Sequence, residues 1–450
     1  MMQTLRIAAA LICLAGATVA AADWPHWRGP NGTGTTSETN LPVRWSATEN
    51  VAWKAPIAGL GVSSPIVAGD RIFVTSQLGS GVRREGNHPR LMQGSAAAAS
   101  GERAIGSRAA RTDGRTIFVV EAFHRADGRR LWEYRLEAEG SLAGVHDKHN
   151  LASSSPVTDG ERVYAWFGTG QIVALDMNGR LVWQRHLGKE ISPFDVIWGH
   201  SSSPTIFGGT AILLADHTSA AYLLALDART GRDRWKADRG RSRMSYSTPL
   251  VVTAPTGPEL VVNSSERVDG YDPRNGALLW HVGGENRFPV PMPVFADGII
   301  YMSRGYRSSP YFAVRPGGRG DVSKTHVVWE SATGAPYVSS LVHDAGLLYM
   351  ATDVGAVTVV DAATGLRTSQ QRIDGIFSAS PVAADGKVYF VSENSETIVM
   401  QAGRNPTVLA RNDLGERAIA SPAISGGQIF IRTDDHVFAI GVPGRRAGAR

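Results

Sequence analysis

The stretch Ala152 to Gly188, ASSSPVTDGERVYAWFGTGQIVALDMNGRLVWQRHLG, decides the fold. It contains four short runs of β-forming residues, at Ser155 to Thr158, Arg162 to Phe167, Gln171 to Asp176 and Arg180 to His186. The runs are separated by turn residues that tolerate the positive φ angles of tight hairpins, namely Asp159-Gly160, Gly168-Thr169-Gly170 and Asn178-Gly179. This pattern predicts one antiparallel four-stranded meander. Such a sheet cannot bury both of its faces alone, so further copies are expected along the chain.

Two landmarks mark the expected copies. The first is Ser-Pro, Thr-Pro or a relative of it, which recurs roughly every 40 to 48 residues after the first copy, at Ser64-Pro65, Ser155-Pro156, Ser203-Pro204, Thr248-Pro249, Met292-Pro293, Ser340-Leu341, Ser380-Pro381 and Ser421-Pro422. The second is a turn glycine followed four residues later by an aromatic, as in Gly128/Trp132, Gly179/Trp183, Gly231/Trp235 and Gly276/Trp280. Trp329 lies in the same part of the fifth copy. We interpret these indoles as wedges between adjacent sheets.

The two ends of the repeat region are expected to share one sheet. Ala420 to Ile440 supplies only three strands, and Val51 to Ile57 is a lone strand with no hairpin partner nearby. Trp53 stands in that lone strand where the wedge of the incomplete copy belongs. Pairing of the two segments would close a ring and remove its exposed edges. We therefore predict an all-β, eight-bladed β-propeller of four-stranded antiparallel blades, closed by pairing of N- and C-terminal strands, with seven blades as the alternative.

The first residues are typical of a signal peptide. Residues 1–22 combine Arg6, the apolar run Ile7 to Leu14 and small residues before Asp23. We therefore expect export to the periplasm or cell envelope. The residues before Cys13 lack the small side chain that lipid acylation requires, which disfavours a lipid anchor.

The rest of the chain, 23–443, is predicted to be the propeller. It begins with a turn-rich arm, Asp23 to Pro42, which the indoles of Trp24 and Trp27 are expected to press onto the folded body. Residues 78–114 are rich in Gly, Ser, Ala and Arg, so they are predicted to be a flexible insertion in the first blade. Residues 444–450 are predicted to be a disordered basic tail.

Composition narrows the function classes. The 450 residues are 43% hydrophobic and carry a formal charge of +5, an excess too small to indicate a nucleic-acid partner, and no zinc-finger spacing, recognition helix or RNA-binding motif accompanies it. No apolar run after the first residues is long enough for a transmembrane helix. Cys13 is the single cysteine, so the mature chain has no thiolate metal site or c-type haem motif. We expect a monomer.

The Trp-bearing segments ALDMNGRLVW (174–183), ALDARTGRDRW (225–235) and GYDPRNGALLW (270–280) resemble the tryptophan-docking repeat of pyrroloquinoline quinone (PQQ) type propellers. The likeness covers almost the whole mature chain. The family includes quinoprotein alcohol and sugar dehydrogenases and the non-enzymatic outer-membrane assembly factor BamB. The arm DWPHWRGPNG followed by VAWKAPIAGLGVSSP is similar to an exported subgroup of unassigned activity. The repeat is specific for the fold and carries little information on function, because its residues hold blades together.

Polar loops are expected to gather on one half of one face, at the mouth of the channel. In a propeller meander, the loop entering the innermost strand and the loop joining the second and third strands open on that face. The candidate ligand-binding residues there are His146, His149, Asn150, His200, Asp216, His217, Arg243, Tyr246, Glu266, Arg267, Arg287, Arg304, Tyr306 and Arg307. Guanidinium forks and aromatic rings in a cleft favour an anionic or polyhydroxylated ligand. The alternative is that these groups form a structural hydrogen-bond network around a water-filled channel.

Metal and catalytic interpretations of these residues are weaker. His146-x-x-His149 lies in a loop and lacks the glutamate of a zincin motif, so no metal site is expected. Asp216 and His217 are adjacent on a strand end, which points their side chains to opposite faces and argues against an acid-base pair. The recurring serines mark no nucleophile, because no Gly-x-Ser-x-Gly elbow accompanies them.

Two functions therefore stay open. The preferred one is an exported, non-catalytic, BamB-like binding or scaffolding module without a cofactor, whose partner is an envelope protein or an anionic or polyhydroxylated ligand. The alternative that the resemblance implies is a PQQ-dependent quinoprotein oxidoreductase acting on alcohols or sugars. It is less favoured because the mature chain lacks the adjacent cysteine pair that several alcohol dehydrogenases of the family place against the cofactor. It would place the PQQ carboxylates on arginines such as Arg243, Arg287 and Arg304, and Ca²⁺ on Glu266, Asn150 and Asp216.

Overall fold

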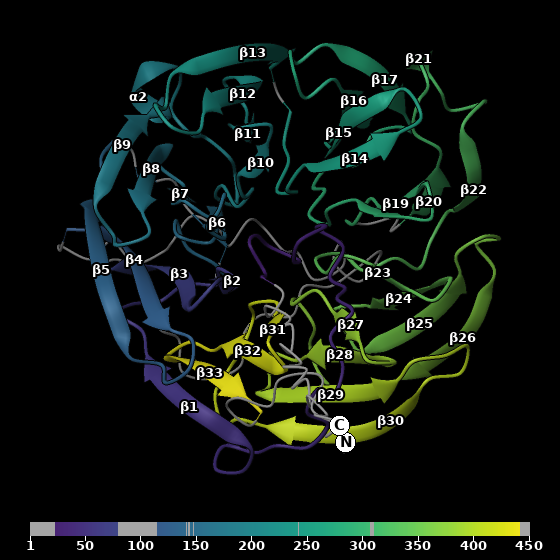
Figure 1. Ribbon diagram of the computed structural model, residues 1–450. Helices are drawn as coiled ribbons and strands as arrows, with labels where there is room; N and C mark the ends of the chain where they lie inside the picture. The colour runs from purple at the N-terminus through teal and green to yellow at the C-terminus, as the bar shows by residue number, and fades with distance from the viewer. Residues whose placement is uncertain are drawn as a thin grey trace, which may run out of the picture.

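The computed structural model describes residues 23–79, 115–140, 142, 145–146, 148–241, 243–306 and 310–441. The predicted signal peptide at 1–22, most of the insertion predicted at 78–114, the tail predicted at 444–450 and the candidate residue Arg307 lie outside the described residues. The described strands form a closed ring (Figure 1).

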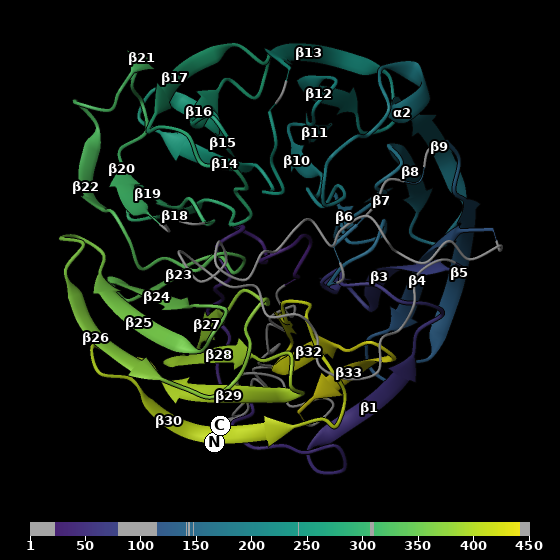
Figure 2. The same cartoon turned by 180° about the vertical axis from the view of Figure 1, so that it is seen from behind.

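Eight antiparallel sheets stand around a central axis, which confirms the predicted eight-bladed propeller (Figures 1 and 2). We number the blades 1 to 8 in chain order. Blades 1 to 4 are β2 (Ile66–Ala68), β3 (Arg71–Leu78), β4 (Ile117–His124) and β5 (Arg130–Glu137); β6 (Val157–Thr158), β7 (Arg162–Trp166), β8 (Gln171–Asp176) and β9 (Leu181–His186); β10 (Thr205–Phe207), β11 (Thr210–Asp216), β12 (Ala221–Asp227) and β13 (Asp233–Gly240); and β14 (Leu250–Ala254), β15 (Gly257–Asn263), β16 (Val268–Tyr271) and β17 (Leu278–Val282).

Blades 5 to 8 follow the same order from the axis outward. They are β18 (Val294–Ala296), β19 (Ile299–Ser303), β20 (Tyr311–Val314) and β22 (Val327–Ser331); β23 (Val342–Asp344), β24 (Leu347–Ala351), β25 (Ala356–Asp361) and β26 (Arg367–Arg372); β27 (Val382–Ala384), β28 (Lys387–Val391), β29 (Glu396–Gln401) and β30 (Thr407–Asp413); and β31 (Ala423–Ser425), β32 (Gln428–Arg432), β33 (His436–Ile440) and β1 (Val51–Pro56). The short helix α2 (Leu187–Glu190) follows β9.

The stretch from Ala152 to Gly188 forms blade 2. Its strands pair as the turn residues predict, with Val163 opposite Leu175 in β7 and β8. The first strand begins at Val157, two residues later than expected, because Pro156 has no N–H for a strand ladder. The N–H of Ser155 donates instead to the hydroxyl of a serine in blade 3.

Blade 8 joins the two ends of the repeat region, as predicted. β1 pairs antiparallel with β33, from Val51 opposite Ile440 to Pro56 opposite His436. The sheet order is β1-β33-β32-β31, so the N-terminal strand is the outermost strand of the last blade. Figure 1 shows purple β1 beside yellow β33. Because the ring is closed, each blade has a neighbouring blade on both sides.

Five of the six predicted docking tryptophans lie on the turn of the next blade. Nε1 of Trp183 donates to the carbonyl of Ala228 (3.0 Å), and its ring covers Gly231 so closely that a Cβ there would lie 2.7 Å from it. Equivalent contacts join Trp53 to Arg125 and Gly128, Trp132 to Met177 and Gly179, Trp235 to Pro273 and Gly276, and Trp329 to Ala362 and Gly365. These turn glycines have φ of 70 to 82°, so backbone conformation and lack of space both require glycine.

Trp280 departs from this pattern. Its Nε1 donates to Glu259 within its own blade (2.7 Å), and its ring covers Gly270 of the adjacent strand. The corresponding turn of blade 5 is longer and carries β21 (Gly320–Asp321), which pairs in parallel with β17 at Trp280 and His281. The sheet of blade 4 therefore has five strands, and a backbone ladder joins blades 4 and 5 where an indole joins five other pairs of blades.

The N-terminal arm crosses the centre of the ring (Figure 1). Trp24 is 1% exposed and exchanges backbone hydrogen bonds with Val67 of β2 at 2.9 and 2.8 Å. Farther along, Thr35 forms a parallel bridge with Ala383 of β27. The arm thus connects blade 1 with blade 7 through the axis, and contacts the inner strands rather than the outer wall.

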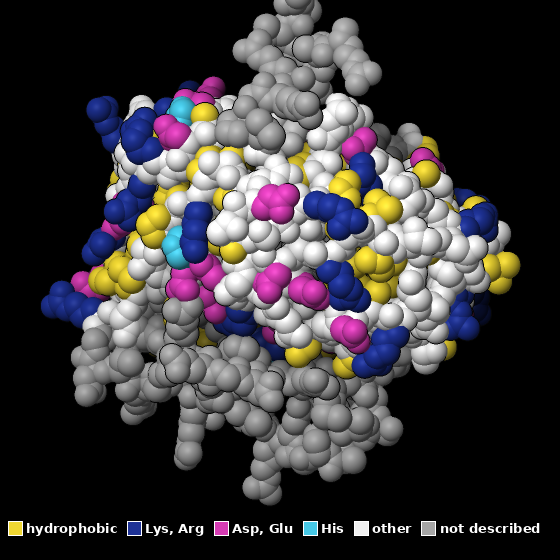
Figure 3. All heavy atoms as spheres, turned by 90° about the horizontal axis from the view of Figure 1, so that it is seen from below, with side chains coloured by type: hydrophobic (Ala, Val, Ile, Leu, Met, Phe, Trp, Pro, Cys, Tyr) yellow, Lys and Arg dark blue, Asp and Glu magenta, His cyan; other side chains and the backbone are white. Residues whose placement is uncertain are grey.

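The outer wall carries charges of both signs. Figure 3 shows basic and acidic side chains interspersed on the side seen from below, with hydrophobic side chains scattered between them. Leu181, Leu278, Leu366 and Val408 are among the exposed hydrophobic residues, and they belong to four different blades. Scattered apolar residues of this kind are normal on a protein surface.

Replacement of Gly231 by alanine tests the docking of Trp183. We expect Gly231→Ala to lower the free energy of unfolding by roughly 2 to 4 kcal/mol, because the new Cβ is disfavoured at this φ and also meets the indole. Gly209→Ala is the matched control: its φ of 74° resembles the 70° of Gly231, but nothing lies within 4 Å of the added Cβ. It should cost only about 1 to 2 kcal/mol. Urea denaturation measures both, and equal losses would contradict the docking role.

Candidate functional site

The arm divides the axial channel into two cavities. One cavity of about 180 Å³ lies at the mouth and one of about 510 Å³ lies on the opposite face, and Trp27 lines both. Nε1 of Trp27 donates to the hydroxyl of Ser421 (3.3 Å). The adjacent Arg28 is 1% exposed, and its guanidinium donates to the carbonyl of Thr33 (2.7 Å) and to carbonyls at the entrances of blades 6 and 7. Burial lowers the pKa of Arg28 to about 9. These bonds fix the arm in the channel.

The mouth cavity has mainly aromatic, aliphatic and hydroxyl-bearing walls. Its aromatic and larger aliphatic side chains are Trp27, Trp198, Tyr246, Tyr337, Val62, Val290, Val338 and Ile419. Of the ionisable residues predicted for the mouth that the structure describes, only His146, His149 and Tyr246 line this cavity, together with Lys148. A cavity therefore lies at the mouth, and its lining is less charged than expected.

Serines before the prolines form a chain of hydrogen bonds around this cavity. The N–H of Ser64 donates to the hydroxyl of Ser155 in the next blade (2.9 Å), and the same link joins Ser155 to Ser203, Ser203 to Thr248, Met292 to Ser340, Ser340 to Ser380, and Ser380 to Ser421. Met292 has no hydroxyl, so it interrupts the chain between blades 4 and 5. The hydroxyls satisfy backbone donors that would otherwise be buried without a partner. This is the physical reason for the Ser-Pro landmark.

A buried ion pair spans the mouth. Nζ of Lys148, in the loop before blade 2, lies 2.6 Å from Oε1 of Glu393 in blade 7, and the two side chains are 6% and 2% exposed. The hydroxyl of Ser378 donates to the same carboxylate oxygen. Because Lys148 and Glu393 compensate each other's charge inside the protein, neither is a free charge for a ligand to bind.

The two histidines of the mouth cavity act as wall elements. Burial, with the nearby charges of His149 and Lys148, lowers the pKa of His146 to about 3, and its ring stands edge-on to Trp198 at 5.5 Å between centroids. Burial also lowers the pKa of His149, whose Nδ1 lies 3.0 Å from the hydroxyl of Ser153 and whose Nε2 contacts the carbonyl of Trp198. Both rings are therefore neutral at pH 7.

The other predicted histidines and Asn150 lie behind the wall. His200 is 1% exposed and packs on Trp166 at 4.1 Å between centroids, and burial lowers its pKa to about 3. His217 is paired with Asp195, with 3.0 Å between Nδ1 and Oδ1. The side-chain amide of Asn150 donates to the carbonyl of Leu60 (2.8 Å) and accepts from the N–H of Ala152 (2.9 Å). These residues support the loops rather than face the cavity.

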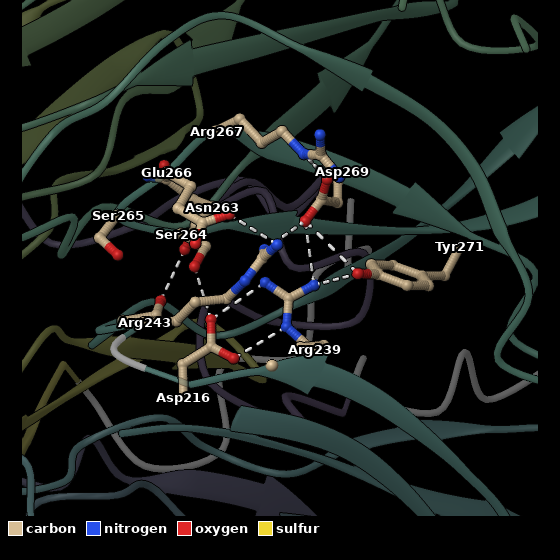
Figure 4. Close-up of polar contacts among 12 residues, drawn as sticks. Asp216, Arg239, Arg243, Asn263, Ser264, Ser265, Glu266, Arg267, Asp269 and Tyr271 are labelled. Atoms are coloured by element: carbon tan, nitrogen blue, oxygen red, sulfur yellow. Dashed lines mark hydrogen bonds and ion pairs between the residues drawn. The ribbon is translucent and has the colours of Figure 1, made fainter. Parts of the chain in front are cut away.

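A buried charge network joins blades 3 and 4 (Figure 4). Arg239 donates to both oxygens of Asp216, at 2.8 and 3.0 Å, and to Asp269 at 3.1 Å, and none of the three side chains is exposed. Ser264 donates a further bond to Asp216 at 2.6 Å. Burial alone would raise the pKa of Asp216, but the Arg239 guanidinium outweighs it and holds that pKa below its ordinary value.

The predicted arginine cluster is neutralised by this network. Arg243 donates to Asp269 at 3.0 Å and lies 2.7 Å from Glu266, while Arg267 donates to Asp269 at 2.7 Å. Figure 4 shows these guanidinium groups directed at carboxylates of the chain itself. The geometry favours the structural-network alternative for this half of the mouth over a cleft for an anion.

The remaining candidates also have protein partners. Arg304 is 3% exposed, and its guanidinium donates to the side chain of Asn263 and to the carbonyl of Gly284, the latter at 2.8 Å. Burial lowers the pKa of Arg304 to about 10. Arg287 is exposed and lies over the ring of Phe288 at 5.8 Å. The ring of Tyr306 packs 5.1 Å from that of Phe288.

The residues predicted for PQQ and Ca²⁺ lie outside the lining of the mouth cavity. Arg243 and Arg304 are bound to protein groups, and Asp216 is closed off by Arg239 and Ser264. None of the six residues named for the cofactor and the cation lines the mouth cavity. Among the described residues, no three His, Cys, Asp or Glu side chains are grouped so as to hold a metal ion.

Sequence reasoning missed Trp27, Lys148 and Tyr337 as parts of the mouth. Trp27 was expected on the folded body, but nothing in its neighbours indicates that it crosses the axis. Lys148 lies between two candidate histidines, and its partner Glu393 is 245 positions away, so only the ring geometry brings them together. In the part of the chain that the structure describes, no helix is long and apolar enough to cross a membrane.

Comparisons with known proteins bear on this geometry. The family model described as outer membrane protein assembly factor BamB matches residues 117–365, 320–405 and 357–442. A curated relative, the serine/threonine-protein kinase AfsK of Streptomyces griseus, is 33% identical over 110 residues, which is 24% of this chain. The matched region spans only 13% of that kinase.

Solved structures share the fold at low identity. BamB from Moraxella catarrhalis matches with a TM-score of 0.52 and 14% identity, over 73% of this chain and 90% of that one. Quinohemoprotein alcohol dehydrogenase ADHIIG from Pseudomonas putida HK5 matches with a TM-score of 0.64 and 11% identity, over 95% and 82%. The computationally designed Ika8 protein matches with 0.57 and 10%, over 87% and 100%. At such identities the likeness concerns the fold alone.

Removal of one charge from the Asp216–Arg239 pair tests whether the network is structural. We expect Asp216→Asn to lower the free energy of unfolding by roughly 3 to 5 kcal/mol, because Arg239 keeps a buried charge with less compensation. Glu266→Gln is the control, since the Glu266 side chain is 46% exposed and its loss should cost less than about 1 kcal/mol. Denaturant unfolding measures both values. A loss below about 1 kcal/mol in Asp216→Asn would show that the network contributes little.

Proposed function

The chain belongs to the PQQ-like propeller family whose model is described as outer membrane protein assembly factor BamB, and on this premise we propose that it is a non-catalytic binding or scaffolding module of the cell envelope. Export rests on the signal-like residues 1–22. The proposed partner is an envelope protein that docks on the channel mouth.

One observation carries the non-catalytic assignment: most of the buried charges described at the mouth are paired with one another. Lys148 is paired with Glu393, and Arg239 and Arg243 are paired with buried carboxylates. The cavity histidines have pKa values lowered by burial. A general acid or base needs a proton that it can exchange with a bound substrate near pH 7, and the described wall supplies no side chain tuned in that way.

The mouth cavity suits an apolar anchor from a protein partner. At about 180 Å³ it is comparable with a cavity of roughly 150 Å³ that holds one benzene ring, so it accommodates one aromatic or branched aliphatic side chain. Trp198, Tyr246 and Tyr337 supply aromatic surface for such a contact. Buried aromatic pockets of this kind are where protein interfaces concentrate their binding energy.

Exposed apolar side chains on the loops of the same face support a protein partner. Ile197, in the loop before blade 3, is 50% exposed, and Val354, between β24 and β25, is 42% exposed. In the meander both loops open at the mouth. An apolar pocket favours a protein side chain over an anionic ligand, whose charge the paired arginines do not match.

The quinoprotein alternative has a direct test. Addition of PQQ and Ca²⁺ to the purified protein should cause no saturable change in cofactor absorbance, and a dye-linked screen of alcohols and aldoses should detect no turnover, because Arg243, Arg304 and Asp216 are bound to other groups of the protein. Saturable cofactor binding that is accompanied by turnover would overturn the non-catalytic assignment.

Docking at the mouth is tested by site-specific photo-crosslinking in cells. A photoreactive amino acid at Ile197 should give a discrete adduct with an envelope protein, because this side chain lies at the proposed interface. The same amino acid at Leu366, which is 69% exposed on a turn of the opposite face, should give none. The adduct should disappear when Trp198→Ala is added. Adducts of equal yield at both positions, or none at Ile197, would contradict a docking site at the mouth.

A further inference from the structure

The larger of the two axial cavities has no part in the function proposed above. It measures about 510 Å³ and lies between the arm and the inner strands β10, β14 and β18. Asp297, in the turn from β18 to β19, is part of its wall, and turns of this kind lie on the side of the ring opposite the mouth. The volume falls within the roughly 300 to 1,000 Å³ typical of small-molecule sites, which the mouth cavity does not reach.

The wall combines an aromatic surface with many hydroxyl groups. The arm supplies the indole of Trp27, the amide of Asn31 and the hydroxyls of Thr33 and Thr35. The blades supply Thr205, Thr248, Thr253, Phe295, Asp297 and His343. A hydroxyl that donates within the protein, as Thr205 does to the carbonyl of Pro249 (2.8 Å), keeps lone pairs that can accept a bond from a ligand.

The ionisable groups of this cavity select against charged ligands. The residues that line it include no lysine or arginine, and burial lowers the pKa of its two histidines, His26 and His343, so an anion would find no strong cation and would face the carboxylate of Asp297. One carboxylate is also too few for a Ca²⁺ or Mg²⁺ site built from protein oxygens. A hydrocarbon would make no use of the Asn31 amide or of the hydroxyl lone pairs that remain on threonines such as Thr205. The remaining class is a neutral ligand with an apolar face and many hydroxyls.

We propose that this cavity binds a neutral saccharide unit. A pyranose ring presents C–H groups on one face, which fits against an aromatic side chain such as Trp27 or Phe295, and hydroxyls at its edge, which fit the threonines. Asp297 accepts bonds from ligand hydroxyls, since its side chain is 75% exposed. His343 lies 3.3 Å from Asp297 and stacks in parallel on Tyr301 at 5.7 Å, which holds the imidazole beside the carboxylate.

The arm half of this site is held by contacts within the protein. Gly32 has a φ of 66°, and a Cβ there would lie 2.7 Å from Leu250 of β14; Gly34 has a φ of 77°, and a Cβ there would lie 2.7 Å from the Arg28 guanidinium. The arm backbone is therefore packed against β14 and against its own buried arginine. A preformed wall lowers the entropic cost of ligand binding.

Isothermal titration calorimetry with glucose, galactose, N-acetylglucosamine, cellobiose and chitobiose tests the proposal on the full mature protein. At least one of these sugars should bind saturably at one site. Asp297→Asn and Thr253→Val should each weaken that binding roughly tenfold, which corresponds to the loss of about one good hydrogen bond. Both positions are exposed, and asparagine tolerates the φ of 51° at Asp297, so both variants should keep the wild-type melting temperature.

Trp198→Ala at the mouth is the matched control. It should leave sugar binding unchanged, because Trp198 lines the mouth cavity and has no part in the wall of the larger one. Absence of binding by all five sugars, or binding that both cavity variants retain at wild-type strength, would overturn the proposal. Because partner docking is read from crosslinks at the mouth and sugar binding from calorimetry, failure of either proposal is distinguishable from failure of the other.

Discussion

The contact on which the rest of this structure depends is an indole of one blade lying on the turn glycine of the next. A four-stranded sheet cannot bury its apolar faces alone, so each blade is stable only against its neighbours. Trp183 on Gly231 supplies that contact at the outer rim, and the serine hydroxyls supply a second one near the axis. Where both attachments are present, as between blades 2 and 3, their different distances from the axis fix how the adjacent blades sit.

Closure and the axial arm follow from the same constraint. The pairing of β1 with β33 completes the last blade with its own docking tryptophan, Trp53. The arm that precedes β1 then enters the channel, where Arg28 bonds to carbonyls of blades 6 and 7. A buried guanidinium that donates to carbonyls is costly to displace, because those acceptors would lose their partners. The axial channel is consequently divided into two cavities of different chemistry.

The charged residues of the mouth illustrate how composition can mislead about a site. Arg243, Arg267 and Glu266 lie in one region, as the meander predicts, and together they indicate a ligand cleft. In the fold both arginines pair with Asp269, and Arg243 also pairs with Glu266, so these charges are compensated inside the protein. The cavity walls are instead made by aromatic and hydroxyl side chains, at the mouth and on the opposite face.

The sequence by itself determined the repeat, the blade count, the closing strand and five of the docking tryptophans. Each of these depends either on residues close together in the chain or on the number of repeats and strands, which can be counted along the sequence. It also placed His146, His149 and Tyr246 at the mouth. Only the tertiary structure decided that Trp27 separates two cavities, that Lys148 meets Glu393, that Trp280 turns to Glu259, and which charges neutralise one another. Those pairs lie in different blades or depend on one irregular turn, and a repeating pattern carries no signal for which side chains meet across a ring.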